Sequence, residues 1–416
     1  MINEPIMVKR RLSTGVLEKV GQLAENKKGT FFQYDQSYLS KHNKSISPFK
    51  LESNLTVQKE NKGLHGNLHG VFADSLPGSW GHYLIERKCQ TLKRNPRLLS
   101  PLERLLMISG HGTGALTYES NNHRYKNDYS DIPLSTLENA AISEFELIDT
   151  DYIDTLLNAS GAGGSRPKLN LIRKPDHTYA TDPSTPGTPV IIKLASKKLP
   201  LGENEPLVEF IYLEMAKKAG IDVPRCDILS TNQNSVYWLE LERFDCNYNI
   251  GRSHTISAGG LLDAPSNMPS LDYLDLIKAT YTLCGPADAK KMFKRALFNY
   301  LTCNQDDHSK NFSFISNDQD EWTLAPMYDV TYSPNYLGGH MTSFMGYSSS
   351  LPKNALDKLS MQAGLSGYKA GLRVAEEIYE VVSGFNTLAE DLFLDKPLKR
   401  CIQETIDKKW KDLPSK

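Results

Sequence analysis

The sequence predicts an α+β protein, with strand-rich segments before residue 265 and helical segments after it. Short apolar or alternating runs between turn residues indicate strands, and they concentrate in the first of these regions. Apolar residues at helical spacing indicate helices, and they dominate 271–302 and 353–416. A chain of 416 residues is long enough for two or three domains that each bury a core.

The first 120 residues predict a β-rich module that also contains helices. Ser100 is a good cap for the second of these helices, and Pro101 suits its first position. Glycines around His111 favour a tight connection into a strand over a functional loop. Polar residues then indicate a linker, which we assign to 121–145. The elements expected in this module are strands at 16–23, 29–34 and 115–118, and helices at 80–91 and 101–108.

A glycine-rich segment, SGAGGSRPK at 160–168, follows a short helix expected at 151–157. Backbone amides of such a loop can approach phosphate oxygens closely, because glycine has no Cβ. The segment is not a Walker A loop, which needs Gly-Lys-Ser/Thr at the start of a helix. It is therefore a candidate phosphate-binding loop, and the alternative is an ordinary turn between a helix and a strand.

A lysine near the end of an apolar strand at 189–194 is the next candidate. Lys193 is costly to bury without a partner, and its strand is similar to the V-A-I-K strand whose lysine contacts nucleotide phosphates. The alternative places Lys193 at the solvent end of the strand. Glu209, on a helix expected at 205–219, either pairs with Lys193 or faces solvent. A further strand at 237–245 completes the element order of a kinase small lobe.

The stretch NQDDHSKNFSFISNDQDEWTLAPMYDV at 304–330 carries the strongest chemical signal. Asp306 and Asn311 have the D-x-x-x-x-N spacing of the protein-kinase catalytic loop. Phosphoryl transfer needs one carboxylate to accept a proton, and carboxamide and carboxylate oxygens to hold two Mg²⁺ ions. Asp329 follows an apolar run that indicates a strand, which would return it to the same site. A solvated loop is the alternative, because Asp and Asn are common turn residues.

The composition argues against several classes of protein. A net charge of −1 disfavours nucleic-acid binding through overall charge. The chain has no apolar run long enough for a transmembrane helix, and its N-terminus lacks the apolar core of a secretory signal, so we expect a cytoplasmic protein with no membrane partner. The six scattered cysteines include no C-x-x-C pair, which favours free thiols over disulfides or a zinc site.

Together the motifs resemble the HipA-type serine/threonine kinases, the toxins of bacterial type II toxin–antitoxin pairs. The resemblance implies a protein-kinase-like bilobal core, with a β-rich small lobe at 146–265 and a helical large lobe at 266–416, after the N-terminal module at 1–120. The matching segments occur in family order over roughly residues 10–345 and are FADSLPGSWG, RLLMISGHGTGAL, SGAGGSRPK, IIKL, LERFD, NQDDHSKNFSF and LAPMYDV.

The resemblance also implies roles for individual residues. Asp306 is expected to be the catalytic base, and Asn311 and Asp329 are expected to hold Mg²⁺. ATP is the implied cofactor, with its adenine taken by backbone groups of a hinge at 242–244. The residues expected around the nucleotide are Gly161, Gly163, Gly164, Ser165, Lys168, Lys193, Glu242, Phe244 and His308.

The implied partners are a protein substrate, which in characterised members is an aminoacyl-tRNA synthetase, and a small helix-turn-helix antitoxin. DNA is expected only indirectly, through the antitoxin. One departure from the family concerns a glycine-loop serine that the kinase itself phosphorylates. That position is Gly161 here, so self-phosphorylation would have to use Ser160 or Ser165.

Two other functions remain open at this point. The first is a small-molecule phosphotransferase, which would share the D-x-x-x-x-N loop and the later Asp; the N-terminal module argues against it. The second is a non-catalytic module that binds the antitoxin and acts in repression, and the presence of all the expected catalytic residues argues against it.

Overall fold

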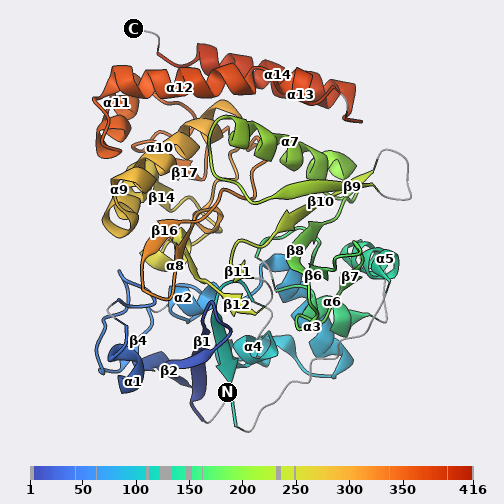
Figure 1. The fold of residues 1–416 in the computed structure, drawn as a ribbon, viewed down its shortest axis with the longest axis vertical. Coiled ribbons are helices and arrows are strands. Elements are labelled where there is room, and N and C mark those ends of the chain that lie inside the picture. The colour runs from blue at the N-terminus through green and yellow to red at the C-terminus, as the bar shows by residue number, and fades with distance from the viewer. Residues whose placement is uncertain are drawn as a thin grey trace. The chain divides into compact units, whose positions relative to one another are not determined.

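The computed structural model describes residues 4–42, 44–61, 63–108, 112–121, 133–146, 152–161, 163–230, 236–247, 250–336, 338–390 and 392–414. The chain forms two compact units (Figure 1). The first unit combines Met1–Leu199, Glu240–Asp263 and Ile315–Glu321, and the second combines Pro200–Leu239, Ala264–Phe314 and Trp322–Lys416. The predicted domain boundaries at 120, 145 and 265 stay a prediction.

The N-terminal part of the first unit contains an antiparallel sheet with the order β4-β3-β2-β1-β5. Every second side chain of β1 is buried, which gives the sheet its core face. The turn from β2 to β3 is closed by Asn26, whose Oδ1 accepts a hydrogen bond from the Lys28 amide at 2.7 Å. The predicted strands in this part are confirmed. The strands are β1 (Ile6–Arg11), β2 (Leu17–Asn26), β3 (Gly29–Tyr34), β4 (Gln58–Lys59) and β5 (Leu116–Glu119).

Both predicted helices of this part are also present. Helix α4 begins with a capping box, in which Ser100 Oγ accepts from the Glu103 amide at 3.2 Å and Glu103 Oε2 accepts from the Ser100 amide at 2.8 Å. Pro101 occupies the first position, as its sequence context predicts. Residues 109–111, with His111, lie outside the described residues. The helices are α1 (Gln36–Leu39), α2 (Gly70–Ala73), α3 (Ser79–Thr91), the 3₁₀ helix η1 (Pro96–Leu98) and α4 (Pro101–Met107).

The rest of the first unit is built on a second sheet, with the order β7-β6-β8-β10. Strand β10 begins in the second unit, where it neighbours β9 (Cys226–Ser230). The predicted linker range 121–145 contains helix α5 at its end, and 122–132 lie outside the described residues. The remaining elements are α5 (Leu134–Phe145), α6 (Ile153–Asn158), β6 (Lys168–Arg173), β7 (Tyr179–Ala180), β8 (Thr188–Lys193), β10 (Tyr237–Glu242), β11 (Cys246–Asn247), β12 (Gly251–Arg252), β13 (His254–Ser257) and α8 (Ala258–Leu262).

The second unit is mainly helical, as the sequence predicts. Its buried centre is α10, which packs against α9, α11, α12 and α14, with the red C-terminal helices lying alongside α10 and α7 in Figure 1. Pro286 starts α10 after Gly285, whose φ of 89° favours glycine. Its elements are η2 (Gly202–Asn204), α7 (Glu205–Lys218), β14 (Leu271–Asp272), α9 (Tyr273–Cys284), α10 (Pro286–Leu301), η3 (Ser309–Asn311), β15 (Ser313–Ser316, which continues into the first unit), β16 (Trp322–Leu324), β17 (Thr342–Ser343), α11 (Lys353–Gln362), α12 (Tyr368–Val382), α13 (Phe385–Leu388) and α14 (Lys396–Lys411).

Two properties predicted from composition can be compared with the structure. All six cysteines have free thiols, as the sequence predicts. Within the described ranges, no helix combines the length and the apolar character that crossing a membrane requires.

Candidate active site

The loop from Asn304 to Asn311 follows directly from α10 and is held by a buried carboxylate, Asp307. Asp307 accepts hydrogen bonds from the Tyr273 hydroxyl at 2.6 Å, from His340 Nδ1 at 2.9 Å and from the Met341 amide at 2.8 Å. Burial, with the charge of Asp307, raises the pKa of Tyr273 well above its usual value, so its hydroxyl stays a donor. These contacts fix the loop on α9 and on the segment before β17.

Asp306 and Asn311 are brought together by this loop. Asn311 Nδ2 donates to the backbone oxygen of Asp306 at 2.7 Å, and Asn311 is 9% exposed. Because its amide nitrogen is used in this way, the carboxamide presents Oδ1 as its remaining donor atom for a cation. Asp306, which precedes the buried Asp307 in the chain, is itself half-buried.

The segment that carries Asp329 runs beside the same loop. The Tyr328 hydroxyl donates to the Lys310 carbonyl at 2.7 Å, and it lies 2.5 Å from Ser313 Oγ. Thus Tyr328, which precedes Asp329, contacts one residue before Asn311 and one residue after it. Asp329 itself has a φ of 51°, a left-handed conformation that Asp tolerates better than most residues.

A second set of contacts joins the start of the loop, at Asn304 and Asp306, to Ser333, which follows Asp329 in the chain. Ser333 Oγ accepts from the Asp306 amide at 3.1 Å and donates to Asn304 Oδ1 at 3.1 Å. The Ser333 amide donates to the Cys303 carbonyl at 3.2 Å, and Asn304 and Ser333 form a parallel bridge. The structure therefore places the Asp306, Asn311 and Asp329 segments side by side in the second unit.

The oxygen donors of this set fit Mg²⁺. Asn311 and Asp329 offer hard carboxamide and carboxylate oxygens, which Mg²⁺ prefers. Among the described residues, no three His, Cys, Asp or Glu side chains gather as a metal cage. Mg²⁺ does not need such a cage, because it commonly binds through one or two protein ligands together with water and phosphates.

The candidate phosphate-binding residues lie in the first unit. Lys168 on β6 and Lys193 on β8 are register partners in an antiparallel pair, so they share one face of the sheet. They are only 3% and 5% exposed, which excludes the solvent-end alternative for Lys193. Two lysines at opposed positions on one face of the sheet are candidates for binding a polyanion such as a triphosphate. Lys168 Nζ also donates to the Gly163 carbonyl in the glycine loop.

The glycine loop packs against the start of α3. The Trp80 amide donates to the Gly164 carbonyl at 3.4 Å, and a Cβ at Gly78 would collide with the Gly164 backbone. Gly161 is buried and Gly163 is exposed. The two serines differ in the same way: Ser165 is exposed, whereas Ser160 is fully buried.

Ser160 is further constrained by its hydrogen bond. Its Oγ donates to the Leu157 carbonyl at 2.8 Å, at the end of α6. A buried hydroxyl that already donates to the backbone is a poor acceptor of a phosphoryl group, so of the two serines only Ser165 is accessible.

The expected hinge leaves the sheet at β10 and is tied to neighbouring residues. The Arg243 amide donates to the Pro189 carbonyl at 2.9 Å, and the Gly114 amide donates to Asp245 Oδ2 at 2.7 Å. Arg243 pairs with Asp245 at 2.6 Å. Glu242 accepts from Arg173 at 2.7 Å, and Phe244 is half-buried in the turn that follows. The hinge is thereby linked to the loop before β5.

Two further expected residues lie in the second unit. His308 caps η3, where its Nδ1 accepts from the Lys310 amide at 3.3 Å. Glu209 is 3% exposed on α7, which excludes the solvent-facing alternative; its pairing with Lys193 stays a prediction.

Sequence reasoning missed Asp307, Tyr328 and Ser333, which hold the candidate residues in place. The adjacent pair Asp306-Asp307 was the available signal for the first, because one carboxylate of such a pair can serve as an anchor. Nothing local distinguishes Tyr328 or Ser333, whose partners are 15 to 29 residues away in the chain.

The whole fold has a solved counterpart. The Shewanella oneidensis MR-1 toxin–antitoxin structure of HipA with HipB and operator DNA matches with a TM-score of 0.68 and 16% identity, over 97% of this chain and 96% of that one. The chain therefore has the HipA fold, which confirms the predicted α+β class with a kinase-like core and an N-terminal β-rich module.

The family follows from matches to both of its domains. The HipA N-terminal domain matches residues 17–119, and the HipA-like C-terminal domain matches residues 160–389. The chain belongs to the HipA family, which confirms the resemblance of its motifs.

Two curated relatives are similar to this chain over part of its length. The putative kinase of Haemophilus influenzae (strain Rd) is 25% identical over 252 residues, which are 57% of this chain and 68% of that protein. The toxin YjjJ of Escherichia coli (strain K12) is 23% identical over 319 residues, which are 73% of this chain and 64% of that protein.

Proposed function

We propose that this protein is an ATP- and Mg²⁺-dependent serine/threonine protein kinase of the HipA toxin type. One observation carries the proposal: the hydrogen bonds of Asn311, Tyr328 and Ser333 hold the Asp306, Asn311 and Asp329 segments together. That is the residue set that phosphoryl transfer needs. The proposal also draws on the kinase name of the Haemophilus influenzae relative.

In the proposed reaction, a substrate hydroxyl oxygen attacks the γ-phosphorus as the bond to the ADP oxygen breaks. The Asp306 carboxylate accepts the hydroxyl proton. Asn311 and Asp329 would hold Mg²⁺, which would neutralise the negative charge of the nucleotide phosphates. Lys168 and Lys193 hold nucleotide phosphate oxygens beside the glycine loop of the first unit. Little covalent work falls to the protein, so positioning supplies most of the rate.

The proposed partners follow from the family and the Shewanella complex. That complex contains HipA, HipB and operator DNA. By analogy, we propose a small helix-turn-helix antitoxin for this chain, with DNA contacted through it. The proposed substrate is a protein of the translation machinery, such as an aminoacyl-tRNA synthetase, met in the cytoplasm.

The test is transfer of label from [γ-³²P]ATP in an extract of the host cell, with the purified chain and Mg²⁺. We expect a labelled protein band that is absent without the chain. A labelled small molecule in place of a protein would favour the alternative of a small-molecule phosphotransferase. No ATP turnover under any condition would favour a non-catalytic antitoxin-binding module.

A further inference from the structure

The two candidate magnesium ligands lie at the two ends of one hairpin. Asn311 precedes β15, and Asp329 follows β16. The strands are joined near their base by the Ala325 amide, which donates to the Ser313 carbonyl at 2.9 Å. At the tip, Asn317 closes the turn by accepting from the Gln319 and Glu321 amides at 3.0 and 2.9 Å. The two strands therefore connect the tip to both candidate ligands.

The tip belongs to the first unit, where the buried side chain of Arg10 holds it. Arg10 Nη1 donates to Asp320 Oδ1 at 3.1 Å, and Arg10 Nη2 donates to the Asn317 carbonyl at 2.5 Å. Arg10 and Asp320 have side-chain exposures of 2% and 7%. Asp320 has a φ of 60°, so its backbone is also set for this turn.

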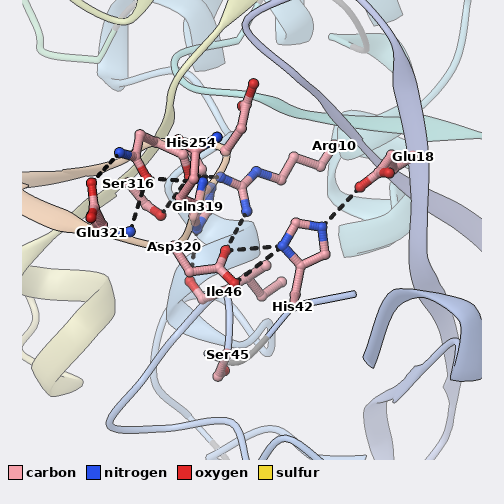
Figure 2. A network of polar contacts seen from close by, with 12 residues as sticks. Arg10, Glu18, His42, Ser45, Ile46, His254, Ser316, Gln319, Asp320 and Glu321 are labelled. Carbon is pink, nitrogen blue, oxygen red and sulfur yellow. Dashed lines mark hydrogen bonds and ion pairs between the residues drawn. The ribbon is translucent and has the colours of Figure 1, made fainter. Parts of the chain in front are cut away.

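His42 makes a second contact with the same carboxylate (Figure 2). Its Nδ1 lies 3.0 Å from Asp320 Oδ1, and its Nε2 lies 2.8 Å from Glu18 Oε2. The hydrogen bond to His42 lowers the pKa of Glu18. The ring thus lies between two carboxylates, in a chain of contacts that runs from β2 through His42 to the hairpin tip.

Ser13 makes a third, independent contact with the tip. Its amide lies 3.1 Å from Asp318 Oδ2, and its hydroxyl donates to the same oxygen at 2.5 Å. Three residues of the N-terminal 42 therefore bind three positions of this turn, Asn317, Asp318 and Asp320, which lie 278 to 310 residues later in the chain.

Such a network is a costly way to obtain stability alone. Removing two charges from water costs several kcal/mol per ion in proteins, and well-packed apolar residues often stabilise as well or better. A buried ion pair is, however, directional, so it fixes the position of the group it binds. Here the group it fixes is the turn between two strands that lead to Asn311 and Asp329.

We propose that Arg10, His42 and Asp320 are positioning residues for Mg²⁺ binding: by fixing the hairpin tip, the N-terminal module sets the spacing of Asn311 and Asp329. The inference rests on the proposed function, because it takes these two residues as the magnesium ligands.

The test is calorimetric binding of a non-hydrolysable ATP analogue to the full chain over a Mg²⁺ titration. Asp320→Asn keeps the shape of the side chain and removes its charge. We expect it to raise the Mg²⁺ concentration for half-maximal binding by about fivefold, in the range typical of coupled sites, with no change in the metal-free affinity. Faster amide exchange at 313–324 should accompany the shift, because the hairpin is no longer held.

Glu321→Gln is the matched control, because it makes the same chemical change in the same turn. Glu321 contacts Asn317 within the hairpin and is exposed. We expect its Mg²⁺ midpoint to equal that of the wild type. Equal midpoints for Asp320→Asn, Glu321→Gln and wild type would overturn the inference.

Two further variants keep the result decisive. If Asp320→Asn does not fold, Ser13→Ala replaces it, and we expect a smaller rise in the Mg²⁺ concentration for half-maximal binding. An unchanged Mg²⁺ midpoint for Ser13→Ala would count against the inference. Asp329→Ala separates the two proposals, because it should abolish the Mg²⁺ dependence in any case. If Asp329→Ala binds like the wild type, the metal site itself is wrong and the inference is lost with it.

Discussion

At the scale of single residues, two buried glutamates on α5 illustrate how the surroundings decide the effect of a charge. Glu144 is 1% exposed and accepts from Arg87 Nε at 2.5 Å and from the Tyr83 hydroxyl at 2.7 Å. Glu138 is 2% exposed, and its Oε1 has no hydrogen-bond partner among the described residues. Burial raises the pKa of Glu138 to about 8, so near neutral pH it is largely protonated.

The change Glu138→Gln is expected to stabilise the protein at pH 8 by more than about 1 kcal/mol. Burial raises the pKa of Glu138 from 4.5 to about 8 in the folded protein, so the stability that its carboxyl contributes is fully present below pH 4.5. That contribution is lost as the pH rises to about 8, at about 1.4 kcal/mol per pH unit. The gain from Gln should therefore be small at pH 5. Chemical denaturation at the two pH values measures it.

Glu144→Gln provides the contrast on the same helix. It removes the charge that pairs with Arg87, and we expect it to destabilise the protein by about 1–3 kcal/mol. A loss of stability from Glu138→Gln at pH 8 would show that its carboxyl has a partner that stabilises the ionised form.

The sequence was sufficient to select the candidate catalytic residues but not the residues that hold them in place. Asp306, Asn311 and Asp329 could be selected because a known reaction needs those groups at that spacing. Which of the adjacent carboxylates Asp306 and Asp307 is buried depends on Tyr273 and His340, which are distant in the chain. Burial of Lys193 was likewise left open, because a strand's register with its neighbours is not a local property.

At the scale of elements, local signals were sufficient for most strands and helices. The capping box at Ser100 and the proline after it predicted α4, because both act within one helical turn. Strand β10 ends at Glu242, earlier than the predicted 245, where Arg243 bonds instead to the Pro189 carbonyl. Helix α5 was not predicted, because the polar tract before it indicated a linker.

The two serines of the glycine loop are expected to differ in self-phosphorylation. After incubation of the purified protein with Mg²⁺ and ATP, we expect phosphate on Ser165 and none on Ser160. Ser165 is exposed, whereas Ser160 is buried and donates to the Leu157 carbonyl. Phosphopeptide mapping measures both sites.

Ser165→Ala is the control for this prediction and should remove the label from the loop. Phosphate on Ser160 would mean that the loop leaves the conformation described here. Phosphate on neither serine would end the proposal that this loop carries self-phosphorylation.

At the scale of the whole molecule, the compact units are discontinuous in sequence. Residues 240–263 and 315–321 belong to the unit that begins at the N-terminus. The sequence suggested contiguous ranges, since periodicity and composition report only on neighbours in the chain. Contacts such as Arg10 with Asp320 depend on the complete fold, so they were out of reach of that reasoning.

The proposed function depends on Asp306, which we propose accepts the proton during transfer of a phosphoryl group. The most direct measurement is the initial rate of label transfer from [γ-³²P]ATP to protein by Asp306→Ala, with nucleotide affinity measured on the same sample. We expect a rate at least 100-fold below that of the wild type, about the lower limit for loss of a general base, with nucleotide still bound. A rate close to that of the wild type, with the fold intact, would exclude Asp306 as the base.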